Sequence, residues 1–175
     1  MVQSVELLLD SQVDATVRAE WRRLSSARLP SQDRITAESN RPHVTLGVAT
    51  QIPADVEAAL ERELPSAPLP IRLGGVVVFG GRRLTLARLV VPTTALLTLQ
   101  RIVYELMVEC EGVPPHIVPG EWTPHVTLSR RIPATDLGTA IVVTRAGSRD
   151  VVGTSDGIRR WDSDAKREWR ITRRP

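Results

Sequence analysis

The five residues Pro-His-Val-Thr-Leu occur twice in this chain, at 42–46 and again at 124–128. An identical repeat of this length points to an internal duplication, because the 175 residues include only three histidines. In an extended strand, residues i and i+2 point to the same face. The repeat therefore predicts two equivalent strands, each with an imidazole and a hydroxyl on one face and apolar side chains on the other.

The apolar periodicity around both copies indicates short helices and strands. In the first half of the chain it predicts a strand at 2–9, a helix from Val13 to about Arg28 with Ser11 and Asp14 as a capping box, a loop from Pro30 to Arg41 and a strand at 43–50. A short helix after Pro53, a strand at 69–73 and a hairpin of 75–79 and 82–91 around Gly80-Gly81 follow. In the second half it predicts a helix whose apolar stripe runs from Leu96 to Cys110, a loop at 113–124, a strand at 125–131, a helix at 137–144 and a terminal hairpin of 150–161 and 167–173.

The order of these elements repeats with about 85 residues in each half. No long linker separates the halves, so we expect one domain over residues 1–175, with two lobes at approximately 1–91 and 92–175. The predicted class is α+β, because each half mixes helices with strands. We expect the two lobes to enclose a cleft between them.

Composition limits the class of protein and its compartment. With 42% apolar and 25% charged residues it is typical of a globular protein, and no run approaches the roughly 20 apolar residues of a membrane span. The first ten residues lack the basic region of a signal peptide. A single cysteine, Cys110, excludes an internal disulfide and fits a reducing cytoplasm. We therefore expect a cytoplasmic monomer without a membrane partner.

The net charge is +3, and Arg supplies every cation except Lys166. This bias favours either affinity for phosphates or a base composition that replaces Lys by Arg.

The paired histidines and threonines suit acid–base chemistry on a small anionic group. Because imidazole titrates near neutral pH, one of His43 and His125 can hold a proton while the other lacks one. The neutral imidazole would accept a proton from an attacking water, and the charged one would protonate the leaving oxygen. The hydroxyls of Thr45 and Thr127 would donate hydrogen bonds to phosphate oxygens. The set predicts phosphodiester cleavage without a metal, a cofactor or a covalent intermediate.

Structural, metal-binding and nucleophilic roles compete with acid–base catalysis at these positions. A single histidine on a strand is commonly structural, but two in identical contexts favour a shared function. Histidine also binds zinc, yet zinc sites take three or four ligands, and no cluster at ligand spacing accompanies the motifs. A nucleophile lacks support, because there is no G-x-S-x-G segment and Cys110 falls on a predicted helix.

The two His-Val-Thr-Leu segments, at 43–46 and 125–128, resemble the paired H-x-T-x signature of the two-histidine (2H) phosphoesterases. This superfamily includes the bacterial RNA 2′,3′-cyclic phosphodiesterase or 2′-5′ RNA ligase (LigT-like) proteins. The resemblance extends over nearly the whole chain in length, motif spacing and element order. It implies a bilobal, pseudo-twofold α+β fold in which two antiparallel sheets face a central cleft, with the helices packed outside. It also implies an active site in that cleft, with His43 as proton donor, His125 as proton acceptor, and Thr45 and Thr127 holding the phosphate.

The resemblance also implies an arginine that contacts the phosphate shortly after the second motif. Strict alternation from His125 would place Ser129 and Arg131 on the catalytic face. Either the strand bends after Leu128 and Arg130 takes this role, or Arg131 does. We favour Arg130.

Two departures from the family pattern concern the substrate. Gly47-Val48-Ala49 replaces a Phe-Leu-Gly-like run, and polar residues at 31–41 replace an aromatic-rich segment. Bases are commonly held by stacking on aromatic rings, so Trp122 and Trp161 are either stacking platforms or half-buried structural residues. His116 is expected to be either exposed and incidental or a contact in a substrate loop.

We therefore expect an enzyme that hydrolyses 2′,3′-cyclic phosphates of RNA ends or small nucleotides, with ligation at most a minor reaction. Alternatives within the same chemistry are ADP-ribose cyclic phosphate and 2′-5′ linkages. An alternative of another class is a phosphate- or RNA-binding module without turnover. Intact His and Thr in both copies argue against that module, because a binder needs no proton donor and acceptor pair.

Overall fold

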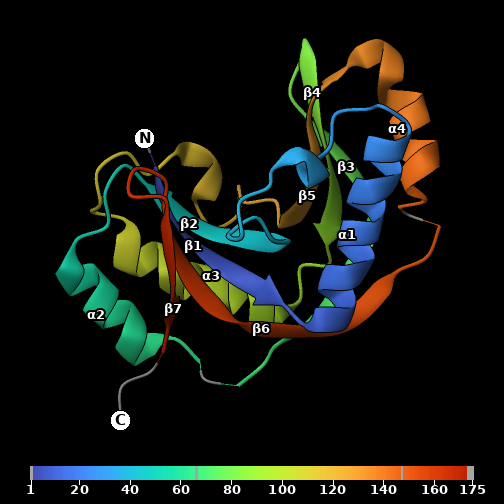
Figure 1. The fold of residues 1–175 in the computed structure, drawn as a ribbon. Helices are drawn as coiled ribbons and strands as arrows, with labels where there is room; N and C mark the ends of the chain where they lie inside the picture. The colour runs from blue at the N-terminus through green and yellow to red at the C-terminus, as the bar shows by residue number, and fades with distance from the viewer. Residues whose placement is uncertain (1, 66, 147, 173–175) are drawn as a thin grey trace.

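The structure is a computed structural model that describes residues 2–65, 67–146 and 148–172 (Figure 1). In this part of the chain, seven antiparallel strands form one sheet. The strands are β1 (Gln3–Leu9), β2 (His43–Ala49), β3 (Pro70–Phe79), β4 (Arg83–Val90), β5 (His125–Pro133), β6 (Val151–Asp162) and β7 (Arg167–Ile171). The helices are α1 (Ser11–Ser26), α2 (Ala54–Glu63), α3 (Thr94–Met107) and α4 (Leu137–Thr144), with short 3₁₀ turns η1 (Gln32–Arg34), η2 (Pro115–Ile117) and η3 (Ala134–Asp136).

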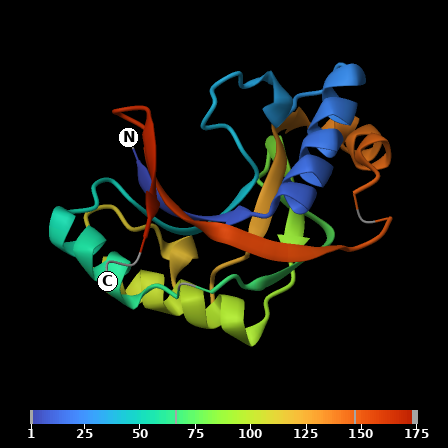
Figure 2. The ribbon, with the colours of Figure 1, turned by 60° about the horizontal axis from the view of Figure 1, so that its bottom comes forward.

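The strand order is β2-β1-β6-β3-β4-β5, with β7 also paired to β6. Residues 151–154 of β6 pair with β3, whereas residues 158–162 pair with β1 and β7. Figure 2 shows β6 crossing the molecule from one group of strands to the other. The predicted α+β class and antiparallel pairing are confirmed, and the two expected sheets are continuous through β6.

The helices cover the outer faces of this sheet. Helix α3 packs against β2 and α2, and α1 packs against β5, β6 and α4 (Figure 1). Their predicted apolar stripes are buried, at Val13, Val17, Trp21 and Leu24 in α1 and at Leu96, Leu99 and Val103 in α3. Among the described residues, no helix is both long enough and apolar enough to cross a bilayer.

Two predictions of helix ends are wrong. The N-cap of α1 is Asp10 rather than Ser11, because the Asp10 carboxylate accepts hydrogen bonds from the backbone N–H groups of Gln12 and Val13, both at 2.9 Å. Cys110 lies beyond the last residue of α3, because the chain turns there and the Cys110 N–H donates to the Met107 carbonyl at 2.8 Å. Its side chain is still buried, as a core residue would be.

Candidate active site

A cleft of about 870 Å³ has both motif strands in its wall. From β2 it is lined by His43 and Thr45, and from β5 by Thr127 and Arg130. Other parts of the wall come from the loop before β2, from β1 and from the β6–β7 hairpin, and Trp21 of α1 also lines the cleft. Further lining residues include Ser4, Glu6, Gln32, Ile35, Ser39, Asn40, Arg41, Arg159, Trp161, Lys166 and Glu168. The structure therefore brings four of the five predicted site residues to one cavity.

The fifth predicted site residue, His125, is the first residue of β5, the strand that also carries Thr127 and Arg130. Its imidazole is half-buried and packs against the Phe79 ring, with the two ring centroids 4.6 Å apart. The charge of His43 contributes to the pKa of His125, so the two imidazoles lie within electrostatic reach of one another.

The same backbone contact orients both imidazoles. His43 Nδ1 lies 2.7 Å from the Arg41 carbonyl oxygen, and His125 Nδ1 lies 2.8 Å from that of Thr123. A carbonyl only accepts, so each Nδ1 carries a proton. In each ring Nε2 is then the nitrogen left to exchange a proton with a ligand.

Two tryptophans hold the motif strands. Trp21 on α1 donates from its indole N–H to the Thr127 carbonyl at 3.0 Å. Trp122, in the loop before β5, donates in the same way to the Thr45 carbonyl at 3.1 Å. The second bond links the segment before one motif to the strand of the other, so Trp122 has a structural contact, whereas Trp161 lines the cleft.

Both motif strands shift register directly after the threonine. The pairing of β2 with β1 shifts between residues 45 and 47, and that of β5 with β4 shifts between 127 and 129. Such a bulge adds one residue to a strand and re-aims the side chains that follow. Val48 and Arg130, each three positions after its threonine, consequently line the cleft.

The bend in β5 distinguishes between the two candidate arginines. Strict alternation from His125 would place Ser129 on the catalytic face. Its side chain is instead buried, and its hydroxyl donates a hydrogen bond to the Pro30 carbonyl at 2.6 Å. A second register shift follows, where Arg131 has a left-handed φ of 62°. Arg130 lines the cleft, whereas Arg131 is not among the residues that line it. The contact of Arg130 with a phosphate stays a prediction.

The surroundings of His125 favour its neutral form. Burial is the largest cause that lowers the pKa of His125 below its usual value. The charges of Arg130, His43 and His116 lower it further, and only the hydrogen bond to Thr123 raises it. His116 itself is exposed on η2.

Glu6 and Arg159 lie in the site but were not predicted from the sequence. Glu6 Oε1 lies 3.6 Å from His43 Nε2, and Glu6 Oε2 lies 2.7 Å from the Arg159 guanidinium. Burial acts to raise the pKa of the Glu6 carboxyl, but His43, Arg159 and Ser4 together outweigh it and lower that pKa. The signal in the sequence was the alternation of Ser4 and Glu6 within an apolar first strand.

Other charged groups complete the wall of the cleft. Arg41 lies 3.6 Å from Glu168, which also pairs with Arg159. Within the described ranges, no group of three or more His, Cys, Asp or Glu side chains is placed to hold a metal ion.

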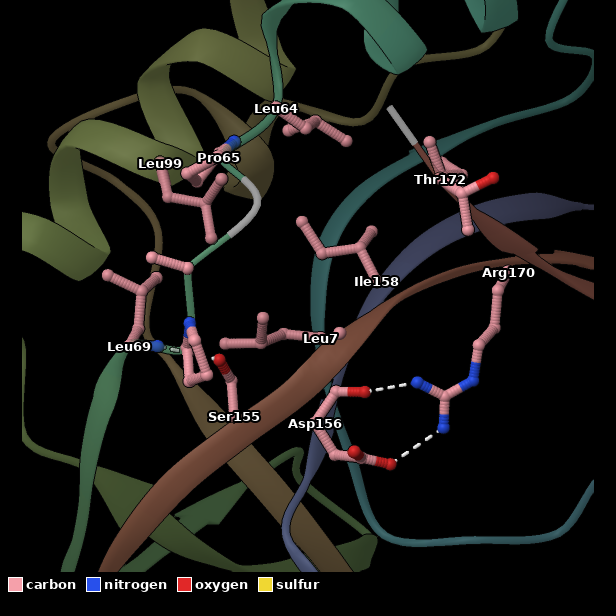
Figure 3. A pocket seen from close by; sticks show the side chains of 14 residues that line it. Leu7, Leu64, Pro65, Leu69, Leu99, Ser155, Asp156, Ile158, Arg170 and Thr172 are labelled. Carbon is pink, nitrogen blue, oxygen red and sulfur yellow. Dashed lines mark hydrogen bonds and ion pairs between the residues drawn. The ribbon is translucent and has the colours of Figure 1, made fainter. Parts of the chain in front are cut away.

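A second cavity, of about 440 Å³, is lined by residues of the α2–β3 connection, α3, β6 and β7 (Figure 3). Its described lining is mainly aliphatic, including Leu7, Leu69 and Ile158, with an Arg170–Asp156 ion pair of 2.6 Å. The motif side chains are not part of that lining, so it offers no acid–base pair.

Comparison with known protein families identifies the family of the chain. The chain matches the family model of the 2′-5′ RNA ligase superfamily over residues 13–167. No curated protein matches the chain significantly.

Several solved structures share the fold. Kluyveromyces marxianus Usb1 with uridine monophosphate has a TM-score of 0.57 and 14% identity, covering 98% of this chain and 97% of its own. The Thermus thermophilus protein TT0787 has a TM-score of 0.56 and 20% identity, with 100% of both chains covered. Escherichia coli LigT complexed with NADP⁺ has a TM-score of 0.54 and 14% identity, covering 98% and 97%. At these identities the likeness establishes the fold.

Proposed function

The chain belongs to the 2′-5′ RNA ligase superfamily, a family of 2H phosphoesterases, and from this premise we propose that it is a metal-independent phosphodiesterase that hydrolyses 2′,3′-cyclic phosphates of RNA ends or small nucleotides. The observation that carries the proposal is the pair of oriented imidazoles, each with Nδ1 bonded to a backbone carbonyl, which leaves Nε2 as the nitrogen that can exchange a proton with a substrate. All the groups that the reaction needs come from one chain, and the lone cysteine fits a reducing compartment such as the cytoplasm.

In the proposed reaction, His125 Nε2 accepts a proton from water while the water oxygen forms a bond to phosphorus. The bond from phosphorus to one ribose oxygen breaks, and His43 Nε2 gives its proton to that oxygen. Thr45 and Thr127 donate hydrogen bonds to the non-bridging oxygens, whose charge grows in the transition state. Arg130 adds a charge-assisted contact to the phosphate. The product is a ribose phosphomonoester, and a proton passed from His125 to His43 through solvent restores the enzyme.

Features of the cleft also support a nucleotide substrate. Trp161 lines the cleft on the β6 side and offers a ring for a base to stack on. Among proteins with the same fold, Usb1 has been solved with uridine monophosphate and Escherichia coli LigT with 3′-AMP, NADP⁺ and ATP. We extend nucleotide binding to this chain on that basis.

The test is a panel of substrates assayed in EDTA: 2′,3′-cyclic mononucleotides, RNA with a cyclic phosphate end, ADP-ribose cyclic phosphate and 2′-5′-linked dinucleotides. We expect turnover of cyclic mononucleotides or cyclic-ended RNA. His43→Ala and His125→Ala should each lower kcat/KM by at least about 10²-fold, the usual contribution of one positioned acid or base. His116→Ala is the matched control, because its side chain is exposed on η2, and it should retain activity.

Each other outcome has a distinct meaning. Preferred turnover of ADP-ribose cyclic phosphate or of the 2′-5′ linkage would keep the acid–base pair and change the substrate. Tight nucleotide binding without turnover, unchanged in both histidine variants, would identify a binding module. Loss of activity in EDTA that Zn²⁺ or Mn²⁺ restores would contradict the metal-independent mechanism.

A further inference from the structure

We infer that Glu6 is a positioning residue that holds His43 in its protonated form and so gives it the role of proton donor. The inference rests on the function proposed above, since a proton donor matters only if His43 takes part in the reaction. The two copies of Pro-His-Val-Thr-Leu are identical, so the difference between donor and acceptor must come from their surroundings.

The position of the carboxylate suits this role. Glu6 is 4% exposed, and its Oε1 lies 3.6 Å from His43 Nε2. That distance allows a strong electrostatic interaction but is too long for a hydrogen bond. The Nε2 proton is therefore stabilised by Glu6 without being bonded to it, and it stays free to reach a substrate oxygen.

Neighbours fix the carboxylate in place. The Ser4 hydroxyl donates to Glu6 Oε1 at 2.6 Å, and the Arg159 Nε–H donates to Oε2 at 2.7 Å. Arg159 is held in turn by the Ser39 carbonyl, at 2.8 Å, and by Glu168. The hydrogen bonds hold Glu6 Oε1, the oxygen nearest to His43, in one position.

The second motif has no equivalent of this carboxylate. Strand pairing places Glu6 opposite Thr45, and it places Ala87 opposite Thr127. Residues paired across neighbouring strands form a row in the sheet. The row that starts at the first motif is Thr45, Glu6 and Arg159, and the row that starts at the second motif is Thr127, Ala87 and Val77. An apolar row with Phe79 against the ring favours a neutral His125, whereas the row beside His43 carries the Glu6 carboxylate at 3.6 Å from Nε2.

Several cations oppose this effect. Arg41 precedes β2, Arg159 lies on β6 and Arg130 lies on β5, and all three line the same cleft. Arg159 is shared between Glu6 and Glu168, and Arg41 also faces Glu168. Glu6 is the carboxylate within ion-pair distance of Nε2, so removing it should reduce protonation of His43, though by less than an isolated pair would.

The experiment is an NMR titration of the histidine side chains in the substrate-free protein, for wild type and Glu6→Gln. We expect the midpoint of the His43 titration to move to lower pH by about one unit, the small end of the effect of a nearby opposite charge. The His125 midpoint should stay in place. In parallel, the alkaline limb of kcat/KM should move to lower pH by about the same amount, costing about tenfold in rate above it.

Glu20→Gln is the matched control. Glu20 is 2% exposed and pairs with Arg88 at 2.6 Å, so the variant also breaks a buried Glu–Arg pair, but beside β4 rather than His43. It should leave both histidine midpoints unchanged. Glu6→Asp keeps the charge on a shorter side chain and should give an intermediate midpoint, which also provides a reading if Glu6→Gln does not fold.

The outcomes separate this inference from the proposed function. The role of Glu6 would be overturned if the pH midpoint of the His43 titration were the same as in wild type in every Glu6 variant that folds. It would also be overturned if Glu20→Gln shifted that midpoint by an equal amount. A shifted midpoint in a protein that turns over no cyclic phosphate would instead support the electrostatic role of Glu6 and reject the proposed function.

Discussion

At the scale of single residues, the segments that follow the two identical repeats differ three positions after each threonine. Val48 and Arg130 take equivalent places behind equivalent bulges, and both line the cleft. Only the second carries a charge, so a phosphate in the cleft would be held more strongly from the β5 side. The bulge in β5 also explains why Arg130, which strict alternation assigns to the other face of the strand, lines the cleft.

Arg130→Ala should weaken binding of a cyclic nucleotide and lower kcat/KM by about 10- to 100-fold, because a hydrogen bond to a charged group contributes about 1.5–3 kcal/mol. Arg131→Ala removes the same charge one residue later, from a side chain that is exposed and is not among the cleft residues. It should change binding less than about twofold. Calorimetric binding to a product mononucleotide measures both, and equal losses in the two variants would mean that net charge rather than position matters.

At the scale of elements, helix α3 supports the strand that carries the first motif. Gly47 of β2 faces this helix, and a Cβ added there would lie 2.6 Å from Met107 Sδ and 2.9 Å from a methyl carbon of Val103. Such contacts are shorter than van der Waals distance, so the side chains of Met107 and Val103, or the strand itself, would have to move. A glycine in the first motif strand is thus a packing requirement.

Gly47→Ala should lower the free energy of unfolding by about 1–3 kcal/mol, the usual cost of overpacking a core, with the flexible Met107 side chain keeping it from being larger. A chain of this size would lose about 2–4 °C of melting temperature for each kcal/mol. The control is Gly75→Ala on β3, where an added Cβ meets nothing within 4 Å, and it should be neutral or stabilise by up to about 1 kcal/mol. Thermal unfolding followed by circular dichroism compares them, and a stable Gly47→Ala protein would contradict the packing argument.

Local patterns were enough to predict most elements of the chain. The amphipathic stripes of α1 and α3 and the Gly80-Gly81 turn between β3 and β4 are properties of neighbouring residues, and the structure has them where the sequence indicates. The N-cap of α1 was not predicted, because Asp10 is held in place partly by a residue far away in the sequence. The backbone N–H of Thr154 donates to the Asp10 carboxylate at 2.5 Å.

At the scale of the whole molecule, the parts of the site that escaped prediction all depend on contacts between distant segments. The bulges arise from the pairing of β2 with β1 and of β5 with β4, and the Glu6–His43 approach joins two strands. The repeat predicts a symmetric pair of histidines. The asymmetry between them appears only when β1 and β6 supply charges on one side and β3 and β4 supply apolar residues on the other.

This asymmetry leads to a prediction for the dependence of activity on pH. In the proposed mechanism His125 must be neutral, so kcat/KM should fall as the pH drops through its pKa. Burial and nearby cations lower that pKa, and the acid limb should therefore lie below the usual imidazole value of about 6.5. Arg130→Met removes one of those cations and should move the acid limb to higher pH, whereas Arg131→Met should leave it in place. The limb of kcat/KM reports the free enzyme, so weaker substrate binding does not disguise the shift. An acid limb above about pH 6.5 in the wild-type protein, or one that stays put in Arg130→Met, would show that a group other than His125 accepts the proton.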